Sequence, residues 1–216
     1  MSGAPNESPS VAFRNVLSSE AELRALVPPP PPERMSVLKE ITCLDEHARA
    51  WIERSRLAFV ATADGEGRCD VSPRGGPPGW VRVLDEHRLA LPDAPGNRRI
   101  DTFRNVLVNP RCGLVFLVPG RTEVLRINGR AWATTDPETL EGIPGNPLLA
   151  LGVEVDEVFL HCSKALIRAS LWDAPAVEDL PSGAEILRAH VARNGRTVSG
   201  EEAEQQVSES IRERIW

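Results

Sequence analysis

Short runs of apolar residues, separated by turn-forming residues, fill the middle of the chain. Residues 57–63 are apolar or small and end at Asp64-Gly65-Glu66-Gly67, a sequence typical of a hairpin turn, after which residues 68–73 return. Residues 80–84 and 88–91 predict a second hairpin. Residues 112–118 form a continuous apolar run, as in a strand buried on both faces, and residues 123–134 and 153–162 also read as strands.

Helical periodicity occurs at fewer places. Residues 101–108 form the one helix predicted between the strands, and Asn109-Pro110 ends it. After Asp45, the residues Ala48, Trp51 and Ile52 share one helical face. Further helices are predicted before residue 28, where Pro28 to Pro32 begin a stiff spacer, and in the tail at residues 184–193 and 203–215.

Several short strands with one helix between hairpins do not fit a parallel α/β sheet. The pattern favours a closed antiparallel barrel with peripheral helices. We expect a mainly β (α+β) fold, a six-stranded antiparallel barrel in residues 45–175, with an N-terminal helical and polyproline extension (1–44) and a C-terminal helical extension (176–216). No glycine-rich dinucleotide fingerprint follows the first strand, which argues against a Rossmann dehydrogenase.

Composition narrows the range of partners. The net charge of −6 argues against a large nucleic-acid interface, which needs an excess of Lys and Arg. No apolar run approaches the roughly 18 residues that span a bilayer, and the first ten residues lack the layout of a signal peptide. We therefore expect a cytoplasmic protein that binds neither nucleic acid nor membrane.

The four cysteines and four histidines are dispersed, and their spacings match no zinc pattern. We expect no metal site. Cys69, Cys112 and Cys162 lie in strand-like segments, where a buried reduced thiol simply packs.

The most informative stretch is residues 90–110, where an apolar strand runs into a loop broken by Pro and Gly. This loop delivers Asn97, Arg98 and Arg99 just before the internal helix. Guanidinium groups and helix N-terminal amides are suited to binding phosphate, and the acidic chain has no general basic coat. The sequence thus predicts an anion site here, although exposed arginines also occur as solvated loop residues.

The order of these segments resembles the pyridoxamine 5'-phosphate oxidase-like flavoproteins. The resemblance covers residues 51–172, more than half of the chain, and each motif is weak alone. It rests on Phe59 to Gly65, Asp70 to Gly76, Asn97 to Arg99, Asn105 to Pro110, Arg126 to Ala131, and His161 to Arg168 with Trp172. It implies a split β-barrel of the FMN-binding type, with FMN at the interface of a homodimer.

The resemblance also assigns expected contacts. Ser72 and Arg74 would line the flavin ring and ribityl chain, Leu91, Pro92 and Asp93 would edge the ring, and Asn97, Arg98 and Arg99 would hold the phosphate. The second subunit would contribute the remaining cofactor-binding residues: Arg126, Asn128, His161, Lys164, Arg168 and Trp172.

The implied function is that of an FMN-dependent oxidoreductase carrying out two-electron transfer on a small-molecule substrate. The sequence does not name that substrate, and no residue stands out as a catalytic acid or base. Family members that oxidise pyridoxamine phosphate end in a strand bearing an arginine and a histidine, whereas this tail reads as helical, so that particular activity is not expected. Two alternatives remain open: a non-catalytic flavin-binding dimer acting as sensor or store, and tetrapyrrole binding through His161.

Overall fold

The computed structural model describes residues 13–94, 96 and 98–214, and the chain divides into two compact units, residues 1–39 and 40–216. In the first unit, α1 (Glu20–Leu26) and α2 (Met35–Leu38) bury none of their residues. Ser19 caps α1 by accepting a hydrogen bond from the Glu22 backbone N–H.

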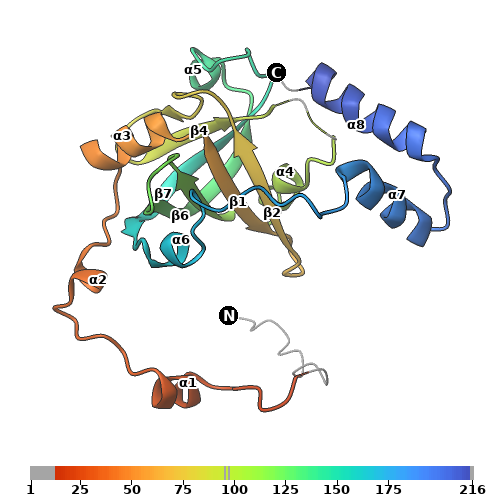
Figure 1. Cartoon of the computed structure of the whole chain (residues 1–216). Helices are drawn as coiled ribbons and strands as arrows, with labels where there is room; N and C mark the ends of the chain where they lie inside the picture. The colour runs from red at the N-terminus through yellow and green to blue at the C-terminus, as the bar shows by residue number, and fades with distance from the viewer. Residues whose placement is uncertain (1–12, 95, 97, 215–216) are drawn as a thin grey trace. The chain divides into compact units, whose positions relative to one another are not determined.

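The second unit is built on one antiparallel sheet (Figure 1). Among the described residues the sheet has seven strands in the order β2-β1-β5-β6-β7-β4-β3. They are β1 (Leu57–Ala63), β2 (Cys69–Gly75), β3 (Arg82–Val83), β4 (Arg88–Pro92), β5 (Arg111–Leu117), β6 (Val124–Thr134) and β7 (Ala150–His161). This is the split-barrel fold that the sequence predicts, with one strand more than the expected six. The additional strand is β3, which has two residues, pairs only with β4 and lies at an edge of the sheet.

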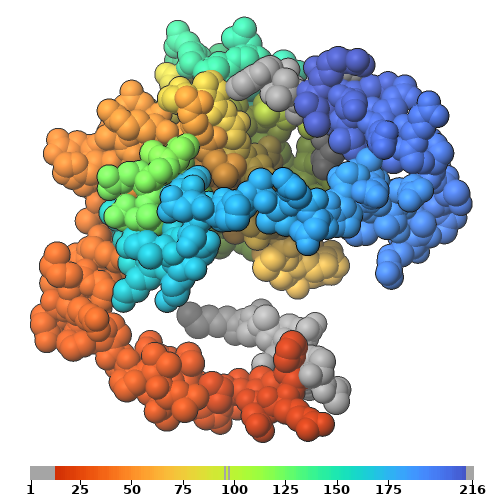
Figure 2. Space-filling view, viewed as in Figure 1, coloured from red at the N-terminus to blue at the C-terminus, as the bar shows by residue number. Residues whose placement is uncertain are grey.

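Helices lie at the periphery of the strands (Figure 1). They are α3 (Glu46–Arg54), α4 (Asp101–Val106), α5 (Pro137–Leu140), α6 (Lys164–Arg168), α7 (Gly183–Arg193) and α8 (Gly200–Arg214). The predicted face of α3 is confirmed, because Ala48 and Ile52 are buried and Trp51 packs against the core. Helices α7 and α8 lie against each other and bury Ala184 and Ala203 (Figure 2). Within the described parts of the chain, no helix is both long and apolar enough to cross a bilayer.

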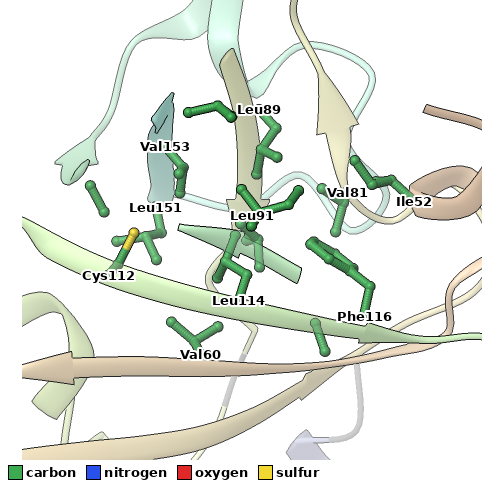
Figure 3. Packing of buried hydrophobic residues seen from close by; sticks show 14 of the residues in the cluster. Ile52, Val60, Val81, Leu89, Leu91, Cys112, Leu114, Phe116, Leu151 and Val153 are labelled. Carbon is green, nitrogen blue, oxygen red and sulfur yellow. The ribbon is translucent and has the colours of Figure 1, made fainter. Parts of the chain in front are cut away.

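The core fills the inside of the barrel. Figure 3 shows side chains from several strands meeting there, among them Val60 of β1, Leu91 of β4, Leu114 and Phe116 of β5, and Val153 of β7. Burying such side chains is the main favourable term in folding, worth about 1.5–3 kcal/mol each. Strands β1 and β5 show strict alternation of buried and more exposed positions, so each presents one face to this core.

The cysteines differ from expectation. Cys112 is buried, but Cys69 and Cys162 are exposed. Cys69 falls on the outward face of edge strand β2, and Cys162 follows the last residue of β7, so neither is part of the packed inner face of the sheet.

The inward-facing residues of β2 are polar, unlike most of those of its neighbour β1, and they mark the position of the site. They are Asp70, Ser72 and Arg74, which pair with Thr62, Val60 and Ala58 of β1. The inward face of β1 is apolar at Ala58 and Val60, with Thr62 as its one polar residue, whereas the inward face of the edge strand β2 is polar throughout. Polar side chains on an inner face need partners or a ligand.

Candidate functional site

A cavity of about 1020 Å³ opens against the polar face of β2. Its size is at the upper end of the range for pockets that take small molecules. Three segments line it: β2 with the turn that follows, the loop from β4, and the start of α4. The lining residues are Asp70, Ser72, Pro73, Arg74, Gly75, Trp80, Pro92, Asp93, Ala94, Gly96, Arg98, Arg99, Ile100, Asp101 and Thr102.

Arg74 is held from three sides. One terminal nitrogen lies 3.3 Å from Asp93 Oδ1, and the other donates to Thr102 Oγ1 at 3.3 Å. The guanidinium also lies 5.7 Å from the centre of the Phe103 ring. Because four-fifths of the Arg74 side chain is buried, these contacts fix its position at the cavity wall.

Asp70 ties two hydroxyl groups together at the same wall. Its Oδ2 accepts a hydrogen bond from Ser72 Oγ at 2.9 Å and another from Thr102 Oγ1 at 3.1 Å. Thr102 is buried, with 1% of its surface exposed. A continuous network thus runs from Ser72 through Asp70 and Thr102 to Arg74 and Asp93.

Helix α4 is anchored beneath the cavity by a buried polar contact. Asn105 Nδ2 donates to Thr62 Oγ1 of β1 at 3.0 Å, and Phe103 and Val106 join the core. Because these contacts hold α4 against the sheet, they also fix the position of Thr102 relative to β2.

The loop between β4 and α4 carries backbone strain. Asp93 is tied to the Leu149 carbonyl by its N–H at 2.8 Å. Further along, Arg98 and Ile100 adopt positive φ values of 59° and 51°. Such conformations are unfavourable for residues with a side chain, most of all for a β-branched one, and persist where surrounding structure enforces them. Arg99 hydrogen-bonds Asp101 Oδ2 at 2.7 Å, and this bond raises the pKa of Arg99.

Charges of both signs line the cavity. Three arginines (Arg74, Arg98 and Arg99) face three aspartates (Asp70, Asp93 and Asp101), so the formal charge of the lining is zero. The Arg99–Asp101 pair is accessible, since 73% of the arginine side chain is exposed. An exposed ion pair of this kind is screened by solvent and contributes little to stability, so an incoming anion can compete for this arginine.

The structure brings six of the predicted residues to this cavity: Ser72, Arg74, Pro92, Asp93, Arg98 and Arg99. Leu91 is instead buried in the core, as Figure 3 shows, and does not line the cavity. Asn97 lies outside the described residues. The roles expected of all these residues toward FMN stay predictions.

Sequence reasoning gave no role in ligand binding to Asp70 or Thr102, which also line the cavity, and expected Trp80, a further lining residue, to be a core or dimer contact. For Asp70 a signal exists, since Asp, Ser and Arg alternate at 70, 72 and 74 and must therefore share one face of a strand. Thr102 is one of several polar residues in a short helix, and nothing local distinguishes it.

Two predicted residues lie on the opposite face of the sheet. Arg126 and Asn128 of β6 are half-buried on the side turned away from the core. Arg126 lies over the Phe159 ring at 4.8 Å, and Asn128 Nδ2 donates to Glu157 Oε1 at 2.7 Å. In the register of the sheet, Arg126 continues a row formed by Pro73, Phe59 and Val115.

The last four predicted residues come after or at the end of β7. His161 is half-buried, with its ring centre 6.3 Å from that of Phe159. Lys164 and Arg168 are exposed on α6, and Trp172 donates its Nε1–H to the Arg121 carbonyl at 2.7 Å. None of them lines the cavity of its own chain.

Comparison with known families decides the relationship. Residues 44–162, more than half of the chain, match the family described as pyridoxamine 5'-phosphate oxidase. The chain belongs to the pyridoxamine 5'-phosphate oxidase-like family. The matched region contains β1 to β7 and every residue that lines the cavity.

Solved structures similar to this chain include three bacterial proteins. HupZ from Group A Streptococcus is 21% identical, with 54% of this chain and 92% of that chain covered and a TM-score of 0.44. General stress protein 26 from Bacillus anthracis is 12% identical (52% and 89% covered, TM-score 0.41). HutZ, the heme storage protein from Vibrio cholerae, is 16% identical (55% and 94% covered, TM-score 0.39). No curated protein sequence matches the chain significantly.

Proposed function

We propose that this member of the pyridoxamine 5'-phosphate oxidase-like family is an FMN-dependent oxidoreductase that transfers two electrons to or from a small-molecule substrate. The observation that carries the proposal is the convergence of Arg74, Arg98 and Arg99 on one cavity of about 1020 Å³. An elongated ligand with an anionic end fits such a cavity, because guanidinium groups bind phosphate oxygens through paired hydrogen bonds.

The cavity lining is formally neutral, yet its two exposed arginines suit the anionic end of FMN and its volume suits a ligand of this size. Arg98 and Arg99 would hold the phosphate, since both side chains are exposed at the cavity rim. Arg74 would lie nearer the flavin, because Asp93 and Thr102 keep it at the inner wall. When bound, FMN supplies the electron-transfer chemistry. The chain supplies orientation and a fixed positive group that stabilises negative charge on a reduced ring.

We further propose that two copies of the chain form a homodimer that completes the site. The outward face of the sheet carries apolar side chains in register, including Phe59 and Val115, and the neighbouring Val71 is 62% exposed. Contiguous apolar surface of this kind marks contact sites. Arg126 and Asn128 lie on the same face and cannot reach their own cavity, so a role toward FMN requires a partner's cavity.

An absorption spectrum of the purified protein, before and after adding FMN, tests the cofactor. A bound flavin should appear with a perturbed visible band and quenched fluorescence. Anaerobic addition of reduced nicotinamide cofactors then tests catalysis: bleaching followed by reoxidation with turnover supports the oxidoreductase. Bleaching by dithionite alone would favour a non-catalytic flavin-binding dimer, and a protein that takes up no FMN would refute the proposal.

Arg99→Gln tests the phosphate contact. It should weaken FMN binding by about ten-fold or more, because a charge-assisted hydrogen bond is lost, and change riboflavin binding little. Arg104→Gln is the matched control, since Arg104 is an exposed arginine that also pairs with Asp101 but does not line the cavity. Equal effects of the two substitutions on FMN binding would remove Arg99 from the phosphate site.

A further inference from the structure

In the hydrogen-bond network around Asp70, the chemistry of each group decides which one donates and which one accepts. A carboxylate has no proton to donate, whereas each hydroxyl group has one. The hydroxyl protons of Ser72 and Thr102 are therefore both directed to Asp70 Oδ2, over 2.9 and 3.1 Å. What these two hydroxyl groups retain for other partners is their lone pairs.

Thr102 shows the consequence within the protein itself. Its oxygen accepts a hydrogen bond from Arg74 at 3.3 Å, as the direction of its own O–H bond requires. Asp70 thus acts on Arg74 through Thr102, and Asp93 holds the guanidinium from the other side. Because Thr102 is buried at 1% exposure, it has little freedom to turn its hydroxyl elsewhere.

We propose that Asp70 is a positioning residue that makes the β2 wall of the cavity an acceptor surface. Ser72 has its proton committed to Asp70, so it presents oxygen lone pairs to the ligand and receives a neutral hydrogen-bond donor such as a hydroxyl group. On the same wall Arg74 is already engaged by Asp93 and Thr102, so the anionic end is left to Arg98 and Arg99. The cavity is thus polarised and selects ligands carrying hydroxyl groups and an anion at separate positions.

This inference rests on the proposed flavin-binding function, and two flavins separate its parts. Riboflavin carries the ring and the hydroxyl-bearing chain without phosphate, whereas FMN carries all three. An acceptor wall contacts what the two flavins share. Asp70→Asn should therefore weaken riboflavin and FMN binding by the same factor, about ten-fold, because a neutral amide oxygen accepts the two hydroxyl protons more weakly than a carboxylate does. The amide NH2 group can also donate to either hydroxyl oxygen, so the two O–H bonds are no longer held in one direction.

The measurement is fluorescence titration of the full-length wild type and variants with each flavin. Ser72→Ala is a second variant, which removes only one surface hydroxyl and should weaken both flavins alike. Asp85→Asn is the control, because Asp85 also accepts hydrogen bonds in a hairpin, from His87 and Arg88, but lies outside the cavity. It should bind both flavins within two-fold of wild type.

A double substitution separates positioning from a general structural effect. In a background of Ser72→Ala with Thr102→Val, the two hydroxyl groups through which Asp70 acts are absent. Adding Asp70→Asn to that background should change riboflavin affinity by less than two-fold. If Asp70→Asn instead acts through a general structural defect, it should weaken riboflavin binding in that background as much as it does in the wild type.

Three results would overturn the inference: Asp70→Asn binding both flavins like wild type, a loss confined to FMN, or an undiminished effect in the double background. A wild-type protein that binds neither flavin would instead refute the proposed function itself, so the two failures are distinguishable.

Discussion

The pKa of a cysteine thiol depends on its surroundings, as Cys112 shows. Its side chain is buried in the core beside Leu114 and Leu151, and burial, followed by the negative charge of Asp156, raises its pKa to about 12. Cys69 and Cys162 are exposed and free. Only a thiolate reacts readily with thiol reagents, so the three cysteines should differ in reactivity.

The pKa of Cys112 gives a stability prediction. In the unfolded chain the thiol ionises near pH 9, whereas in the folded protein it keeps its proton until about pH 12. Between these values the unfolded state binds fewer protons, so stability is fully present below pH 9 and falls as pH rises toward 12. Urea unfolding at pH 7.5 and 10.5 should show a larger loss for wild type than for Cys112→Ala. Equal losses would show that burial of this thiol does not govern alkaline stability.

At the level of elements, the pairing of β6 with β7 depends on one glycine. The register shifts between Asn128 and Gly129, which marks a β-bulge. A Cβ atom at Gly129 would lie 2.1 Å from the Glu154 carbonyl oxygen, far closer than real contacts allow. A side chain there would have to push apart two central strands.

Gly129→Ala should therefore destabilise the protein by about 2–4 kcal/mol, the range of severe core substitutions. Gly152→Ala is a matched control on the neighbouring strand, because its Cβ would meet Thr134 at an ordinary 3.6 Å. Chemical denaturation of both variants measures the difference. Similar stabilities for the two would mean that β7 can move away from β6 at little cost.

The elements also show what a sequence can and cannot predict. Residues 57–63 form a strand as predicted, and the run 112–118 corresponds to β5 (Arg111–Leu117), because side-chain patterns and flanking turns are local properties. The prediction that this second strand is buried on both faces is wrong, since β5 alternates between buried and more exposed positions, and which faces are covered depends on the packing of the whole sheet. Cys69 was misplaced because its burial depends on which strand ends at the sheet edge, a property of the whole topology. Thr102 was missed for the same reason, since its role arises only when α4 docks beside β2.

For the whole molecule, the outward face of the sheet is the surface on which the proposed dimer depends. The face spans five neighbouring strands, from Pro73 and Phe59 through Val115 and Arg126 to Phe159. A second copy of the chain is the proposed occupant. This arrangement would also bring Arg126 and Asn128 within reach of a partner's cavity.

Phe59→Asp tests the dimer. A charge placed in an apolar contact loses favourable burial and is unpaired, so the variant should be monomeric in analytical ultracentrifugation while keeping its thermal transition. FMN affinity should fall with it if the site is shared. Thr134→Asp is a control at the far end of β6, where a charge should leave the oligomeric state unchanged. A dimeric Phe59→Asp variant would exclude this face as the interface.

Strand β2 pairs with β1 alone, since it ends the sheet. Three of the polar residues that line the cavity thus sit on a strand that is paired on one side only. Members of one lineage could accept different small molecules by altering residues 70, 72 and 74, provided that the partners Asp93 and Thr102 change with them. Ligand preference is in this way open to change from the margin of the scaffold inward.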